Sequence, residues 1–176
     1  GGGLAAAGLR PVVEVMYPDF ALMASDQLFN QIGRLRHMYG GQVRFPLVLR
    51  TRIGIGFGYG GQHSLDPAGF FAQFPGWRIL APSNAFDAIG LFNTALRFED
   101  PVLFAEHGKL YGEADDVPDG DLDYCIAYGK ARIMRAGSDV TVLTYMTNVK
   151  RCLQAADELA SEGISALHAD RAGRLW

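Results

Sequence analysis

One segment of this chain places an imidazole directly after a run of closely spaced glycines. Glycines stand at positions 54, 56, 58, 60 and 61, and His63 follows between Gln62 and Ser64. Glycine lets the backbone approach a ligand closely and adopt positive φ, and the same freedom makes many such stretches simply flexible loops. An imidazole can transfer a proton near neutral pH or donate a hydrogen bond to a developing anion. Two roles stay open for His63, a catalytic group or a residue that pins a loop by hydrogen bonding.

The same glycines formally match the GxGxxG pattern of dinucleotide-binding folds, at residues 56–61. That pattern requires its last glycine to begin a helix and an acidic residue to follow about 20 positions later. Here Gln62 and His63 follow the glycines, and the stretch around position 81 holds no acid. This loop therefore does not predict a nicotinamide site.

A second candidate group is the aromatic pair Tyr17 and Phe20, on either side of Pro18 and Asp19. Rings at the end of a strand can stack on a flat ligand, although packing in the core is the alternative for such residues. Of the other histidines, His37 falls within a predicted helix and is expected to be structural or exposed. His107 follows a predicted strand and is a weaker functional candidate.

The elements that must position these residues alternate between short apolar runs and longer periodic ones. The short runs predict strands, and the periodic ones predict helices, the last of them with Ser83 as its N-cap. This alternation predicts an α/β fold with a mostly parallel sheet flanked by helices, in which ligands bind at the carboxyl ends of the strands. The predicted strands cover residues 12–17, 45–50, 77–81 and 101–106, and the predicted helices 28–38, 67–74 and 86–96.

A stretch rich in Asp, Glu and Gly at residues 111–123 is the best candidate for a linker. After it, residues 139–145, 149–159 and 164–168 read as a strand, a helix and a strand, which is one βαβ unit. We therefore expect a first domain over residues 1–121 that lacks its N-terminal part. Residues 122–176 are expected to begin a second α/β domain that stays incomplete.

Composition excludes several classes of function. The chain has 176 residues, of which 49% are hydrophobic and 20% charged, so it can bury a sizeable core. A formal charge of −3 argues against a nucleic-acid partner. No apolar run approaches the length of about 20 residues that spans a bilayer. Two cysteines without a CxxC pair favour a reducing compartment. Residues 1–8 do not read as a signal peptide and instead read as a helix entered midway.

Several short segments, in this order and spacing, resemble one family. Among them are Gln-His-Ser at 62–64, Ala-Pro-Ser at 81–83 and Tyr-Gly-Lys-Ala-Arg at 128–132. The family is the beta subunit of the decarboxylating component of 2-oxoacid dehydrogenases, of the pyruvate, branched-chain or acetoin type. The resemblance covers residues 1 to about 165. The remaining matching segments are 8–14, 26–27, 39–41, 45–50, 75–76, 87–88, 100–104, 137–140 and 162–164.

The resemblance implies a transketolase-like fold, with a pyrimidine-binding domain followed by the start of the C-terminal domain. It implies thiamine diphosphate as cofactor, bound with Mg²⁺ between this domain and a diphosphate-binding domain of an alpha subunit. Phe20 matches the position that stacks on the aminopyrimidine, and Tyr17 is expected to line the same pocket. His63 matches the histidine that faces the thiazolium and the substrate.

A bound potassium ion is known in some members of the family. The resemblance places it near the backbone oxygens of Leu47, Ala95, Phe98 and Asp100, although Phe98 replaces an acidic residue of those relatives.

Two departures from the family concern the ends of the resemblance. The glutamate that hydrogen-bonds the aminopyrimidine would precede Gly1, and Glu14 lies too late in its predicted strand to replace it. The family continues past Ile164 with an Asp-Leu-Arg motif, whereas residues 168–176 of this chain depart from it.

The resemblance implies an α2β2 heterotetramer with the alpha subunit, bound to a lipoyl acyltransferase core. Its reaction is the oxidative decarboxylation of a 2-oxoacid, or the cleavage of acetoin, with acyl transfer to lipoyl groups. This chain alone is expected to be inactive, and its compartment to be a bacterial cytoplasm or a mitochondrial matrix. The alternatives are ketol transfer of the transketolase or deoxyxylulose-phosphate synthase type, and a noncatalytic structural subunit or fragment.

Overall fold

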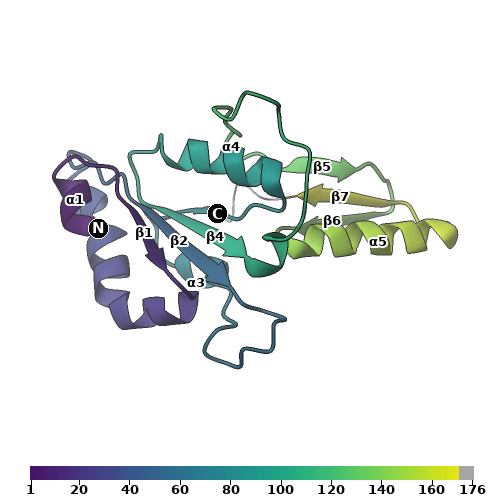
Figure 1. Ribbon diagram of the computed structural model, residues 1–176, viewed down its shortest axis with the longest axis horizontal. Coiled ribbons are helices and arrows are strands. Elements are labelled where there is room, and N and C mark those ends of the chain that lie inside the picture. The colour runs from purple at the N-terminus through teal and green to yellow at the C-terminus, as the bar shows by residue number, and fades with distance from the viewer. Residues whose placement is uncertain (171–176) are drawn as a thin grey trace.

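A parallel sheet of four strands forms the centre of the larger part of the molecule, in a computed structural model that describes residues 1–170 (Figure 1). The strand order is β1-β2-β4-β3, and every neighbouring pair is parallel. This confirms the predicted α/β class. The strands are β1 (Val12–Val15), β2 (Val48–Ile53), β3 (Arg78–Leu80) and β4 (Val102–His107).

Helices cover both faces of this sheet, because the inner strands are apolar on both sides. Leu49 and Leu103 lie in a core that also contains residues from the segments before and after β2. Val48 and Val102 lie in a second core, which they share with residues of α4. The first face carries the 3-10 helix η1 (Pro18–Ala24), the π-helix η2 (Asp26–Ile32), α2 (Leu35–Met38) and α3 (Ala68–Phe71), and the second carries α4 (Ala85–Ala95). The short α1 (Gly2–Ala6) precedes β1.

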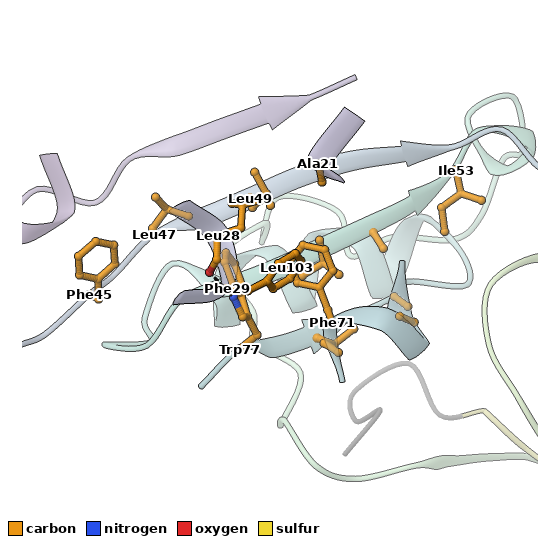
Figure 2. Close-up of a cluster of buried hydrophobic side chains, with 14 of the residues drawn as sticks. Ala21, Leu28, Phe29, Phe45, Leu47, Leu49, Ile53, Phe71, Trp77 and Leu103 are labelled. Atoms are coloured by element: carbon orange, nitrogen blue, oxygen red, sulfur yellow. Dashed lines mark hydrogen bonds between the residues drawn. The ribbon is translucent and has the colours of Figure 1, made fainter. Parts of the chain in front are cut away.

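The core of the first face gathers large aromatic residues from segments far apart in the sequence (Figure 2). Phe29 packs edge-on against Phe71, with 4.9 Å between ring centroids, and Phe71 packs against Trp77 at 5.1 Å. The indole of Trp77 donates a hydrogen bond of 3.0 Å to the Leu28 carbonyl, drawn as a dashed line in Figure 2. This packing fixes η2 against β3.

A smaller sheet with the order β5-β7-β6 lies beyond the carboxyl ends of the first sheet (Figure 1). Strands β6 (Val140–Thr144) and β7 (Ala166–Asp170) are parallel and joined by α5 (Thr147–Ser161), which confirms the predicted βαβ unit. Strand β5 (Arg132–Arg135) runs antiparallel to β7 and was not predicted. Residues 171–176, which include most of the departure from the family, lie outside the described residues.

The linker region holds no helix or strand from residue 111 to residue 131. Its second half nevertheless packs on the first sheet's helices, because Tyr124 stacks on Phe86 and donates a hydrogen bond of 2.8 Å to the Phe86 carbonyl. Ile126 and Tyr128 join the core on the α4 face. The domain boundary at residue 121 stays a prediction. None of the helices among residues 1–170 is long and apolar enough to cross a bilayer.

Several predicted boundaries were shifted, such as the strand expected at 164–168, which lies at 166–170, and two of the shifts have a clear structural reason. The strand expected at 45–50 lies at 48–53. Pro46 has no backbone N–H for a ladder, and pairing continues past the apolar run to Ile53, opposite His107. The N-cap of α4 is Asn84, whose side chain accepts the Asp87 N–H at 2.7 Å. Ser83 instead accepts the Met146 N–H at 2.9 Å and so joins the two sheets.

The helix predicted over residues 28–38 is interrupted. At Gly33, a Cβ atom would lie 2.8 Å from the Trp77 indole nitrogen. The backbone therefore passes so close to Trp77 that a side chain at this position would collide with it. The Leu28 carbonyl accepts both the Trp77 N–H and, at 2.9 Å, the Gly33 N–H five residues later, which is the π-helical pattern. Gly40 and Gly41 follow α2 with φ of 60° and 81°. Glycines of this conformation end helices, which confirms the predicted stop.

Candidate active site

The three residues singled out in the sequence lie together. The ring centroids of Tyr17 and His63 are 4.5 Å apart, those of Phe20 and His63 are 5.3 Å apart, and both contacts are edge-to-face. Tyr17 and Phe20 themselves are 6.4 Å apart. The imidazole thus lies between two rings from a segment more than forty positions earlier.

Local structure sets the position of the two aromatic residues. Tyr17 is the extended residue before η1, and Pro18 begins that helix, where its fixed φ is favourable and its missing N–H costs nothing. The Phe20 N–H bonds to the Tyr17 carbonyl at 3.0 Å, which turns the chain back over itself. The Phe20 side chain keeps 37% of its surface exposed, whereas Tyr17 is half-buried. Phe20 therefore stays partly accessible at the end of β1.

The glycine loop brings His63 to these rings (the segment after β2 in Figure 1). A Cβ on Gly54 would lie 2.1 Å from the His63 carbonyl oxygen, so only glycine allows the two ends of the loop to meet. Gly56, Gly58 and Gly60 adopt φ between 75° and 80°. Asp19 accepts the Leu65 N–H at 3.3 Å and ties the loop to η1. The glycines are thus required by the backbone path that places His63.

The cluster contains further residues that the sequence analysis missed. Tyr59 lies 6.1 Å from Tyr17 and 6.5 Å from His63, between ring centroids, and stacks on Phe57 at 5.2 Å. The guanidinium of Arg52 lies over Tyr17, Phe57 and Tyr59, with its carbon 5.2 to 5.9 Å from their centroids. The sequence signal was present, since an arginine lies just before the glycine run and aromatic residues alternate with the glycines.

A partly exposed charged network lies beside the cluster. Arg50 binds Glu106 through two parallel hydrogen bonds of 2.7 and 2.9 Å, and the Tyr111 hydroxyl donates to the same carboxylate at 2.8 Å. The hydrogen bond to Glu106 raises the pKa of Arg50, and burial with the bond to Glu106 raises the pKa of Tyr111. Arg50 also lies 3.7 Å from Glu14 on β1. This network ties the carboxyl ends of β2 and β4.

Two further histidines, His37 and His107, lie away from this cluster. His37 is exposed on α2. His107 is buried at the end of β4, and its Nδ1 accepts the Lys109 N–H at 3.2 Å. The proton of the neutral ring is therefore on Nε2. Burial and the neighbouring charges of Lys109 and Arg151 lower the pKa of His107. It borders a cavity of about 130 Å³ with Asp66, Tyr145 and Arg151.

The backbone oxygens expected near potassium have other partners. The Leu47 carbonyl accepts the Val102 N–H at 2.8 Å, and the Ala95 carbonyl accepts the Phe98 N–H at 3.3 Å. The Phe98 carbonyl accepts a hydrogen bond of 2.7 Å from Arg10. The Asp100 carboxylate binds Arg36 and Arg78. The potassium site stays a prediction, and Arg10 brings a competing positive charge to it.

The arrangement offers a flat apolar surface next to a proton carrier. A planar heterocycle can stack on Phe20 while the imidazole reaches a group at its edge. Within residues 1–170, no group of three His, Cys, Asp or Glu side chains could hold a metal ion.

Comparisons with known proteins agree that this chain is similar to transketolase-like proteins. The family described as "Transketolase, pyrimidine binding domain" matches residues 1–113, and "Transketolase, C-terminal domain" matches residues 129–168. The acetoin:2,6-dichlorophenolindophenol oxidoreductase subunit beta of Cupriavidus necator is 44% identical over 164 residues, which is 93% of this chain and 48% of that protein. The pyruvate dehydrogenase E1 component subunit beta-1, mitochondrial, of Arabidopsis thaliana is 44% identical over 168 residues, 94% of this chain and 46% of that protein.

Among solved structures, a split-gene transketolase described as an inactive beta4 tetramer superimposes with a TM-score of 0.76. The two share 22% identity over 98% of this chain and 52% of the other, so this likeness concerns the fold. The chain spans about half the length of the curated relatives it matches.

Proposed function

Because this chain belongs to the family of transketolase pyrimidine-binding domains, we propose that it is part of the beta subunit of a thiamine-diphosphate-dependent enzyme. The reaction is the oxidative decarboxylation of a 2-oxoacid, or the cleavage of acetoin, with acyl transfer to lipoyl groups. The observation that carries the proposal is the cluster of Tyr17, Phe20 and His63 at the carboxyl ends of β1 and β2. Ligands of open α/β sheets bind at this edge.

The residues of the cluster fit the aminopyrimidine half of the cofactor. Phe20 has an exposed ring at the end of β1 and stacks on the aminopyrimidine, while Tyr17 forms the wall between it and the loop. His63 holds or moves a proton at the substrate's reacting oxygen and orients the lipoyl group. Thiamine diphosphate, when bound, supplies the nucleophilic carbon and accepts the electrons released by decarboxylation.

The diphosphate and its Mg²⁺ belong to a partner in this proposal. The matched family is that of the pyrimidine-binding domain, which forms one half of the cofactor site. In this proposal the diphosphate-binding half comes from an alpha subunit. The assembly is an α2β2 heterotetramer on a lipoyl acyltransferase core. The compartment is a bacterial cytoplasm or a mitochondrial matrix, since curated relatives of both kinds match this chain.

Ketol transfer of the transketolase type has weaker support. The transketolase structures share 22% identity or less with this chain and speak for the fold alone. The curated relatives at 44% identity are beta subunits that act on acetoin or belong to pyruvate dehydrogenase.

The experiment is to pair the full-length subunit with its alpha partner and to follow reduction of an artificial electron acceptor with pyruvate, a branched-chain 2-oxoacid or acetoin. We expect turnover that requires thiamine diphosphate. His63→Ala should reduce it by about 10²- to 10⁴-fold, whereas His37→Ala, at an exposed histidine on α2, should leave it unchanged. An assembly that turns over none of these substrates contradicts the proposed function, and an unimpaired His63→Ala variant reduces His63 to a residue that pins the loop.

A further inference from the structure

Arg52 is a cation at the candidate site that has no acidic partner in the described part of the chain. It is the fifth residue of β2, and its backbone N–H bonds to the Met16 carbonyl at 3.3 Å, which brings it beside the end of β1. Among residues 1–170 no carboxylate forms an ion pair with its guanidinium, and its Nε is buried without a hydrogen-bond partner. An arginine in this condition has lost part of its hydration without gaining an oxyanion.

The carboxylate opposite Arg52 is already engaged. Glu106 pairs with Arg52 in the register of β2 and β4, yet its oxygens bind Arg50 and the Tyr111 hydroxyl. Both oxygens therefore have short charge-assisted partners, and Arg52 turns to aromatic rings instead.

Four rings hold the guanidinium in place. Its carbon lies 5.8 Å from the Tyr17 centroid, 5.2 Å from Phe57, 5.9 Å from Tyr59 and 5.6 Å from Tyr111. Rings attract a guanidinium electrostatically but do not satisfy its N–H donors, which suit a carboxylate in a bidentate fork. The rings thus orient a cation whose preferred ligand is an oxyanion.

The orientation of Arg52 is linked to the reacting end of the site. The rings of Tyr17 and Tyr59 each contact both Arg52 and His63. A second cation, Lys109, lies 5.7 Å from the Phe57 centroid, so two positive charges lie beside the glycine loop. A small anion bound with its carbonyl near His63 would meet this charge.

We propose that Arg52 binds the carboxylate of the 2-oxoacid and thereby selects this anionic substrate over neutral acetoin. The inference rests on the proposed function and deepens it. The carboxylate is present in the substrate and leaves as CO₂, so Arg52 acts mainly on substrate binding, and its loss should raise KM more than it lowers kcat. Acetoin has no carboxylate and gains nothing from Arg52.

The test uses the full-length subunit assembled with its alpha partner. Arg52→Gln should lower kcat/KM for pyruvate about 10- to 100-fold, mainly through KM, because hydrogen bonds to charged groups are strong, and should lower kcat/KM for acetoin much less. Arg52→Lys should restore part of the pyruvate activity, since it keeps the charge but loses the fork. Arg44→Gln, at an exposed arginine before the opposite end of β2, is the matched control.

Each outcome decides one statement. Equal losses for pyruvate and acetoin would show that Arg52 only supports the loop. Unchanged pyruvate kinetics would show that Arg52 binds no substrate carboxylate. Either result overturns the inference while the proposed function stands. An assembly inactive with every substrate overturns both. Thermal melts of all three variants identify a result caused by misfolding.

Discussion

Two phenylalanines differ in burial, and we expect one to serve cofactor binding and the other to serve folding. Phe20 keeps 37% of its surface exposed next to His63, whereas Phe29 is 3% exposed and packs between Phe70, Phe71 and Phe74. We expect Phe20→Ala to cost little stability but to raise the thiamine diphosphate concentration needed for half-maximal activity. Phe29→Ala should cost about 3–5 kcal/mol of unfolding free energy. A thermal melt and a cofactor titration of both variants measure the difference.

One result would contradict the assignment of Phe20 to cofactor binding. A large loss of stability in Phe20→Ala with an unchanged cofactor titration would assign Phe20 to the core. The edge-to-face contacts of Phe20 with Tyr17 and His63 would then serve only to hold the loop.

At the scale of elements, the start of α4 depends on one side chain. Asn84 has extended backbone dihedrals and accepts the Asp87 N–H, which satisfies one of the free N–H groups at the helix start. Asn84→Ala should cost about 1 kcal/mol of unfolding free energy, measured by denaturant titration. Asn30→Ala is the control, because the Asn30 amide donates to Asp26 on an exposed surface and its loss should cost less. Equal costs would remove Asn84 from its role as N-cap.

At the scale of the whole molecule, His107 couples stability to pH where the two sheets meet. Its side chain is buried beside Tyr145 and Arg151 of the second unit, and burial is the main reason that its pKa lies below the usual 6.5. The unfolded chain takes up a proton near pH 6.5 that the folded chain does not, so the contribution of His107 to stability is complete above pH 6.5. It is lost as the pH falls from 6.5 toward the folded pKa.

His107→Asn should therefore flatten the loss of stability below pH 6.5. Asparagine keeps an acceptor for the Lys109 N–H but does not titrate. Unfolding free energies from denaturant titrations at a series of pH values measure this slope. His37→Asn, at an exposed position, should leave the slope as it is. A His107→Asn variant with the slope of the parent chain would show that other groups carry the pH dependence.

The sequence by itself determined the order and kind of most elements. Apolar runs such as 101–106 and the periodic stretch 86–96 predicted a parallel sheet with helices, because the spacing of apolar residues follows directly from which faces are buried. The glycine spacing and the isolated histidine also marked the candidate site, because glycine allows close backbone approach to a ligand and imidazole can transfer a proton.

Only the tertiary structure decided which side chains meet. The π-helical turn before Gly33 depends on Trp77, a residue more than forty positions later, and no local pattern records that contact. The exchange of roles between Ser83 and Asn84 depends in the same way on Met146 in the second unit. The cage around Arg52 combines rings from the end of β1, the glycine loop and the segment after β4. The engagement of Glu106 by Arg50 leaves Arg52 without an acid among the described residues. Residue spacing reports burial along one segment, whereas the partner of a charge is fixed by contacts between segments.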